Sequence, residues 1–308
     1  MPSLRSYLFK FFLRRLNIFS SESIDLIQTR EKYGKSIFFL RKHKKVDVEL
    51  VDADNVRCEW LVPVSIPRDR VILYLHGGAW FMGSLETYRS MVSRLAFVSK
   101  SPALVVDYRL APENPFPAGL DDCVTTYRWL IKQGYDPKKI VIAGDSAGGN
   151  LTLASIIKLR DDGDPLPGGA VAISPATDLS AELGSKEDSS YRTRANQDVF
   201  FSKMVRNPES NPIGLAYYTH FDPKNPYISP LYANLDGLPK LLMHVGDQEI
   251  LLDDTLEFAA KARSAGVSVT DVVWPHMFHV FHMWAPFLPE ANRALTDIGN
   301  FIQGIQDN

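Results

Sequence analysis

The sequence predicts an α/β protein, with an eight-stranded, mostly parallel sheet that is flanked by helices and carries a helical cap. Short, continuous apolar runs alternate with helix-like segments over most of the 308 residues. Such runs are typical of parallel strands that are buried on both faces. The alternation stops between residues 179 and 227, where Ser, Asn, Pro and aromatic residues predominate. That interruption predicts the cap.

Two strand candidates come first, at 46–51 and 57–62, and they flank the turn-like segment 52–55. The other strands are expected at 71–75, 103–106, 140–143, 170–173, 241–245 and 267–274. Helices are expected at 86–99, 120–133, 149–154, 253–264 and 290–303.

The α/β core is expected to comprise residues 46–178 and 228–308. Residues 1–45 and 179–227 are expected to form the two parts of the cap, the second with helices near 197–206 and 213–220. Loops beyond the carboxyl ends of parallel strands are where such folds bind ligands. The cap is therefore expected above that edge of the sheet.

Charge and cysteine content exclude several classes of protein. The net charge of −2 gives no reason to expect a nucleic-acid partner. Two isolated cysteines, Cys58 and Cys123, form no disulfide framework, so a reducing, cytoplasmic location is expected. No apolar run is long enough to span a bilayer.

The first 45 residues are basic, with eleven Lys or Arg against three acidic residues. Their opening segment lacks the cleavage site of a signal peptide. Its apolar residues fall on one face of a helix: Leu4, Leu8, Phe11, Phe12, Leu16 and Phe19. A helix that packs on its own protein is expected, with a weak membrane-surface contact or a homodimer contact as the alternatives.

The segment Gly144-Asp145-Ser146-Ala147-Gly148 lies between an apolar strand and a helix. A Ser in this strand–turn–helix context is the nucleophile elbow of α/β-hydrolases. The glycines are needed because side chains there would collide with the neighbouring strand and helix. Ser146 is therefore the candidate nucleophile, and it needs a base to take its proton.

A second glycine motif, His76-Gly77-Gly78-Ala79-Trp80, follows strand 71–75. Backbone N–H groups in such a loop form the oxyanion hole of esterases, with a further donor from Ala147 after the nucleophile. A phosphate-binding loop is disfavoured because neither a Walker lysine nor a dinucleotide fingerprint is present.

The base should be a histidine late in the chain, where His276, His279 and His282 recur at a spacing of three. Pro275 and this spacing argue against a metal-binding helix, and His279 is the best candidate. The acid should follow strand 241–245. Asp253 and Asp254 suit the first turn of a helix, which leaves Asp247 and Glu249 as alternatives.

The chain resembles the bacterial hormone-sensitive lipase family of esterases. Ordered motifs carry the resemblance: His76-Gly77-Gly78-Ala79 with Gly83-Ser84, the run from Asp107 to Glu113 with Pro115-Phe116-Pro117-Ala118, Gly144 to Asn150, Ser174-Pro175, Ser229-Pro230-Leu231, Gly237-Leu238-Pro239 and His279-Val280-Phe281. The resemblance implies hydrolysis of short- to medium-chain esters by a serine carboxylesterase, with no metal and no organic cofactor.

The resemblance also implies roles for single residues. The family's triad acid lies about thirty residues before the histidine and just before a Leu-Leu-Asp-Asp stretch, which selects Glu249 although Asp is commoner there. Ala79 replaces the usual third glycine, so Gly77 and Gly78 are assigned as oxyanion donors with Ala147. The charged pair of Asp107 and Arg109 is expected to fix the loop under the site, and Asp145 to orient the nucleophile.

The expected partner is a small-molecule ester. Aromatic and apolar residues are candidates for the substrate pocket, although cap packing explains them equally well: Trp80, Phe81, Met82, Phe200, Phe201, Tyr217 and Tyr218. An amidase, formamidase or lactone hydrolase with the same triad is the main alternative. A non-catalytic ligand receptor on this fold is disfavoured because such receptors typically lose the base, which is present here.

Overall fold

The computed structural model describes residues 2–16, 25–37, 40–180, 198–200 and 212–306. Its centre is one sheet of eight strands: β1 (Val46–Asp52), β2 (Arg57–Pro63), β3 (Val71–Leu75), β4 (Ala103–Val106), β5 (Ile140–Asp145), β6 (Gly169–Ile173), β7 (Lys240–Gly246) and β8 (Val269–Trp274). The strand order is β1-β2-β4-β3-β5-β6-β7-β8. Only the pairs β1–β2 and β2–β4 are antiparallel. The predicted mostly parallel sheet is confirmed.

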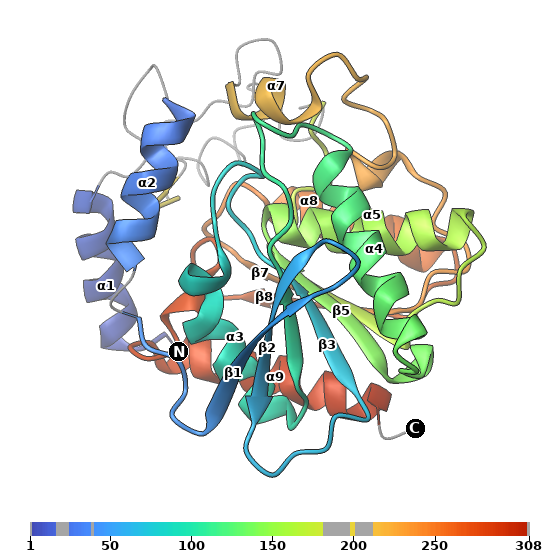
Figure 1. The fold of residues 1–308 in the computed structure, drawn as a ribbon. Helices are drawn as coiled ribbons and strands as arrows, with labels where there is room; N and C mark the ends of the chain where they lie inside the picture. Colours follow the sequence, from blue (N-terminus) through green and yellow to red (C-terminus); the bar gives the residue numbers. More distant parts are fainter. Residues whose placement is uncertain (1, 17–24, 38–39, 181–197, 201–211, 307–308) are drawn as a thin grey trace.

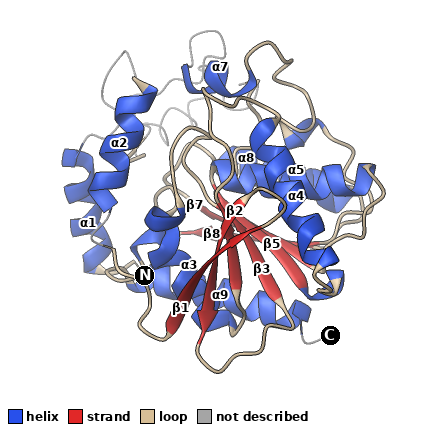
Figure 2. Ribbon diagram, viewed as in Figure 1, coloured by secondary structure: helices blue, strands red, loops and turns tan. Residues whose placement is uncertain are grey.

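Helices surround this sheet (Figure 2): α1 (Leu4–Leu16), α2 (Leu26–Ile37), α3 (Leu85–Ser99), α4 (Ala118–Lys132), α5 (Ala147–Asp161), α7 (Pro212–Tyr218), α8 (Leu252–Ser264) and α9 (Pro289–Gln306), with the 3-10 turns η1 (Pro137–Lys139), η2 (Pro230–Tyr232) and η3 (Phe281–Trp284). Most predicted ends are within two residues of these bounds. The helix expected near 197–206 falls outside the described residues except at 198–200.

Two apolar layers cover the two faces of the sheet. The five side chains of β3 are fully buried and alternate between them. Leu73 and Leu75 belong to the layer of α4, α5 and α8, whereas Ile72 and Tyr74 belong to the layer of α3 and α9. Continuous apolar strands follow from this two-sided burial.

Segments remote in sequence meet beyond the carboxyl ends of the strands. Arg30 of α2 donates hydrogen bonds to the carbonyl groups of Phe81, after β3, and Ala111, after β4. The amide of Phe116 donates to the carbonyl of Tyr217 in α7. In Figure 1, α1 and α2 lie at the left of the sheet and α7 lies above it.

Helix α1 is present, but the face expected to pack on the protein is not the one that does. Ser6, Lys10 and Leu13 are buried, whereas Leu4, Leu8 and Phe11 are exposed. Phe19 lies outside the described residues. Among the helices that the structure describes, none has both the length and the apolar character needed to cross a membrane.

Candidate active site

Ser146 stands on a strained turn between β5 and α5. Its backbone has φ 53° and ψ −118°, a combination that only the surrounding structure can maintain. A Cβ on Gly144 would lie 2.3 Å from the Gly148 carbonyl oxygen, and one on Gly148 would lie 2.0 Å from that of Leu75. Gly144 therefore lets α5 approach β5, and Gly148 lets α5 approach the end of β3.

The structure brings His279 to Ser146. His279 follows β8, and only 6% of it is exposed. Its Nε2 lies 2.9 Å from the Ser146 hydroxyl oxygen, and its Nδ1 lies 2.6 Å from Oε2 of Glu249. A carboxylate can only accept, so Nδ1 carries the proton and Nε2 is free to accept one from the serine.

Glu249, and not Asp247, is the acid that reaches His279. Its side chain is fully buried, and its second oxygen, Oε1, accepts from the Ser174 hydroxyl at 2.8 Å and from the Gly246 amide at 2.6 Å. Asp247 instead accepts from the backbone N–H of His276 at 2.6 Å. The hydrogen-bond partners thus distinguish the two carboxylates, a choice that residue chemistry left open and for which the family resemblance selected Glu249.

The remaining acidic candidates serve the backbone. Asp254, in the first turn of α8, accepts from the amides of Thr177 and Asp178, and neighbouring Asp253 lies in the same turn. Both ring nitrogens of His279 are bonded elsewhere, to Glu249 and Ser146. The positions of Asp253 and Asp254 agree with the helix-start role expected for them.

Negative charge surrounds the imidazole of His279. Burial opposes its protonation, but the hydrogen bond and charge of Glu249, together with the charges of Asp198 and Asp145, outweigh burial and raise the pKa of His279. The site therefore favours the imidazolium form, which is the form a general base reaches after it takes a proton.

The glycine loop requires one correction. The N–H of Gly77 donates to Oδ1 of Asp145 at 3.1 Å, so it is not available as an oxyanion donor. Gly78 (φ 119°) and Ala79 (φ 51°) turn the chain, and within the described residues their N–H groups donate to no other atom. Ala147 is the first residue of α5, where helix N–H groups lack internal partners.

Asp145 holds the glycine loop after β3 in place. Besides Gly77, it accepts hydrogen bonds from the hydroxyl groups of Tyr74 at 2.8 Å and Tyr88 at 3.0 Å. Burial raises its pKa to about 6 although these donors and the charge of His279 lower it. Asp145 thus ties the nucleophile turn to the oxyanion loop, with no hydrogen bond to the serine hydroxyl.

Asp107 and Arg109 do not pair with each other. Asp107 contacts Arg57 at 3.2 Å, whereas Arg109 contacts Asp122 of α4 at 2.8 Å. Each residue anchors the loop to a different element, so the loop is held from two sides.

The three late histidines have separate surroundings. His282 is buried with its Nε2 3.2 Å from Nδ1 of His244, which in turn contacts Asp297 at 2.9 Å. Burial lowers the pKa of both His244 and His282. In the described ranges, no group of three or more His, Cys, Asp or Glu side chains could hold a metal ion.

The residues proposed for the pocket pack together beside the site. Trp80 is stacked on Tyr217 with ring centroids 4.5 Å apart, and Phe81, Met82 and Tyr218 are buried. Phe200 packs on Phe278, the residue before His279. Phe201 lies outside the described residues. Their role as pocket lining stays a prediction.

Sequence reasoning missed Asp198 and the Ser174 side chain as site residues. Asp198 is fully buried and accepts from the N–H of Ile250, next to Glu249, at 3.1 Å. No motif surrounds it in the sequence, so the sequence carries no signal for it. Ser174 belongs to the Ser174-Pro175 motif quoted above, so the sequence did indicate that this position was of interest.

Comparisons with known proteins show which proteins this chain resembles. A family model described as the alpha/beta hydrolase fold matches residues 72–283. An acetyl-hydrolase of Streptomyces hygroscopicus is 38% identical over 255 residues, which cover 83% of this chain and 82% of that protein. The crystal structure of EstE5 soaked with p-nitrophenyl butyrate has a TM-score of 0.91 at 38% identity, covering 99% of this chain and 100% of its own. An esterase from the bacterial hormone-sensitive lipase family has a TM-score of 0.90 at 36% identity, covering 99% of both chains.

Proposed function

We propose that this chain, which belongs to the bacterial hormone-sensitive lipase family of α/β-hydrolases and is a carboxylic ester hydrolase, hydrolyses short- to medium-chain esters through an acyl-enzyme on Ser146. The family membership confirms the resemblance seen in the motifs. One observation carries the proposal of mechanism: the continuous hydrogen-bonded series from Ser146 through His279 to Glu249.

Acylation begins when the Ser146 hydroxyl oxygen attacks the ester carbonyl carbon. Nε2 of His279 takes the hydroxyl proton, and Glu249 stabilises the resulting imidazolium through Nδ1. The negative charge on the carbonyl oxygen is stabilised by the N–H groups of Gly78, Ala79 and Ala147. Ala79 replaces Gly77 in this role because the Gly77 amide is bound to Asp145.

The imidazolium of His279 then protonates the leaving alcohol, and the acyl group stays on Ser146. In the second half of the reaction, His279 accepts a proton from water, which attacks the acyl carbon. Collapse of the second tetrahedral intermediate returns the proton to Ser146 and releases the carboxylic acid.

Residues 1–45 and 179–227 form the cap in this proposal. The contacts of Arg30 with Phe81 and Ala111, and of Phe116 with Tyr217, support that placement. A cap above the carboxyl ends of the strands limits access to Ser146, which favours small esters over emulsified fat.

The location and assembly are proposals as well. A reducing, cytoplasmic compartment suits Cys58 and Cys123, which are both free and buried; burial raises the pKa of the Cys58 thiol to about 12. A homodimer stays a prediction that light scattering of the full chain would test.

The test is hydrolysis of p-nitrophenyl esters from acetate to palmitate by the wild type and by Ser146→Ala. We expect activity that peaks at short or medium chains and disappears in the variant, while its circular dichroism spectrum is unchanged. Parallel assays with the corresponding anilides separate ester from amide hydrolysis. Ordinary activity in the folded variant would overturn the proposal.

A further inference from the structure

Helix α1 presents large apolar side chains to solvent. Leu4 is 76% exposed, Leu8 64%, Phe11 60% and Tyr7 49%, and we call these four side chains the outer face of α1. Soluble surfaces seldom gather so many large apolar residues within two helical turns. The opposite side of the same helix is buried on the protein through Ser6, Lys10 and Leu13.

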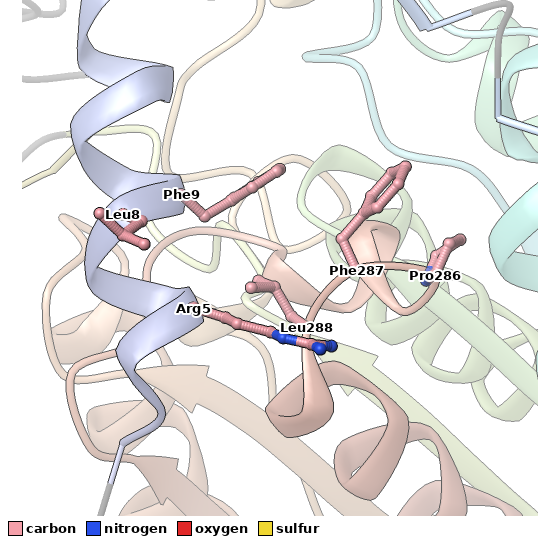
Figure 3. A pocket seen from close by; sticks show the side chains of 6 residues that line it. All are labelled: Arg5, Leu8, Phe9, Pro286, Phe287 and Leu288. Carbon is pink, nitrogen blue, oxygen red and sulfur yellow. The ribbon is translucent and has the colours of Figure 1, made fainter.

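A hollow of about 400 Å³ continues this surface toward the start of α9. Its lining combines apolar side chains with one guanidinium group: Arg5, Leu8, Phe9, Pro286, Phe287 and Leu288. Figure 3 shows Phe9 of α1 and Phe287 extending toward the same space, with Arg5 below them. Phe287 is itself 43% exposed, so the apolar surface extends beyond α1.

The charge of the helix selects the kind of partner. Besides the buried Lys10, helix α1 contains Arg5, Arg14 and Arg15 and no acidic residue. In the described part of the chain, no carboxylate is paired with Arg5. Two such helices brought together would repel each other, whereas an anionic surface would attract them. Apolar side chains combined with basic residues are typical of helices that lie in a membrane interface.

The buried side of α1 is joined to the loops that carry the triad. The Lys10 ammonium donates to Gln248, next to Glu249, at 2.6 Å and to the His276 carbonyl at 2.9 Å. Phe9 is stacked on Phe278, next to His279, with ring centroids 6.4 Å apart. Any surface that binds α1 therefore lies close to the loops that carry Glu249 and His279.

We propose that the outer face of α1 docks on an anionic lipid bilayer and brings the active site to esters dissolved there. Leu4, Leu8 and Phe11 enter the headgroup region, and Arg5 contacts lipid phosphate groups. The docking itself is independent of the reaction, but the delivery of substrate rests on the proposed function.

Sedimentation of the full-length protein with vesicles tests the docking. Vesicles of phosphatidylcholine with phosphatidylglycerol are compared with phosphatidylcholine alone, at low and high salt. We expect the anionic vesicles to bind about tenfold more protein, and salt to weaken the binding. Equal binding to both vesicle types, or none to either, would overturn the proposal.

The variant Leu4→Ser/Leu8→Ser/Phe11→Ser should lower vesicle binding about tenfold or more. Its matched control is Leu50→Ser/Val64→Ser/Leu215→Ser. These three apolar side chains lie outside α1 and are 58%, 56% and 42% exposed. The control variant should bind vesicles like the wild type. Thermal melts check that both variants fold.

Soluble p-nitrophenyl butyrate separates the two proposals. We expect both triple variants to hydrolyse it at the wild-type rate, so a loss of vesicle binding would be specific to the surface. A wild type that binds vesicles but hydrolyses no ester would refute the function and leave the docking intact. The opposite outcome is that the Leu4→Ser/Leu8→Ser/Phe11→Ser variant binds vesicles like the wild type and changes only from dimer to monomer in light scattering. That result would identify a second copy of the chain as the partner of α1 and overturn the proposed docking.

Discussion

Replacing Glu249 with Gln is the sharpest perturbation of the triad. The Gln side chain has the same size, and its carbonyl oxygen can still accept from Ser174 and Gly246, which bind Oε1 in the wild type. Its amide group, however, places N–H toward Nδ1 of His279, where Oε2 now accepts at 2.6 Å. Nδ1 must then become the acceptor, and the ring proton moves to Nε2.

A proton on Nε2 prevents His279 from taking the proton of Ser146, although their atoms remain 2.9 Å apart. Wrong-tautomer substitutions of this kind in other serine hydrolases lower kcat by about 10⁴-fold, and removal of a triad acid has a comparable effect. We therefore expect a loss of about 10³- to 10⁴-fold in kcat, which corresponds to about 4 to 5.5 kcal/mol in activation free energy.

The assay is steady-state hydrolysis of p-nitrophenyl butyrate by the wild type, Glu249→Gln and Asp247→Asn. KM should change little in Glu249→Gln because the substituted side chain lies behind the histidine. Asp247→Asn should stay within about tenfold of the wild type, since its carboxylate serves the His276 amide. A fall of less than tenfold in Glu249→Gln, or a larger fall in Asp247→Asn, would refute the assignment of the acid.

Three further predictions concern the surroundings of the triad. Burial opposes protonation of His279, but Glu249 outweighs burial and raises the pKa of His279. Since only the neutral imidazole accepts a proton, kcat/KM should fall as the pH drops through a midpoint above the ordinary value of 6.5. A midpoint below 6.5 in the pH–rate profile would contradict this prediction. Asp198→Asn should lower that midpoint because it removes one of the charges that raise the pKa; a slower enzyme with an unmoved midpoint would assign Asp198 a purely structural role. Gly148→Ala should lower the free energy of unfolding by more than about 2 kcal/mol, since its Cβ would lie 2.0 Å from the Leu75 carbonyl oxygen. If the variant unfolds at the same denaturant concentration as the wild type, the turn has room for a side chain.

Local sequence was sufficient for the sheet and the nucleophile. Parallel strands buried on both faces are mostly apolar, so runs such as Val71–Leu75 are recognisable by themselves. The elbow motif is also local, because its serine and both glycines lie within five consecutive residues. Both could be predicted without any knowledge of distant contacts.

Contacts between remote residues account for what the sequence did not predict. The direction of the Gly77 N–H depends on Asp145, which is 68 residues away, so a glycine motif alone does not show which amides face the oxyanion. Asp198 reaches Ile250 across 52 residues, from a segment without a motif. The choice between Asp247 and Glu249 likewise depended on loop geometry, which chemistry alone left open.

The orientation of α1 was mispredicted for a related reason. Helical periodicity identifies a face with many apolar residues, but it does not state that this face is the buried one. Here the ammonium group of Lys10 is satisfied by Gln248 and a backbone carbonyl, so a polar residue occupies the buried side. Leu4 and Leu8 remain outside, where the proposed lipid contact would cover them.

The central claim is that Ser146 carries the acyl group during turnover. Mass spectrometry of protein quenched in acid during the hydrolysis of p-nitrophenyl butyrate tests it directly. We expect one butyryl group on the proteolytic peptide that contains Ser146, and none on Ser146→Ala. Rapid turnover with no adduct, or an adduct on another residue that survives in Ser146→Ala, would contradict the mechanism.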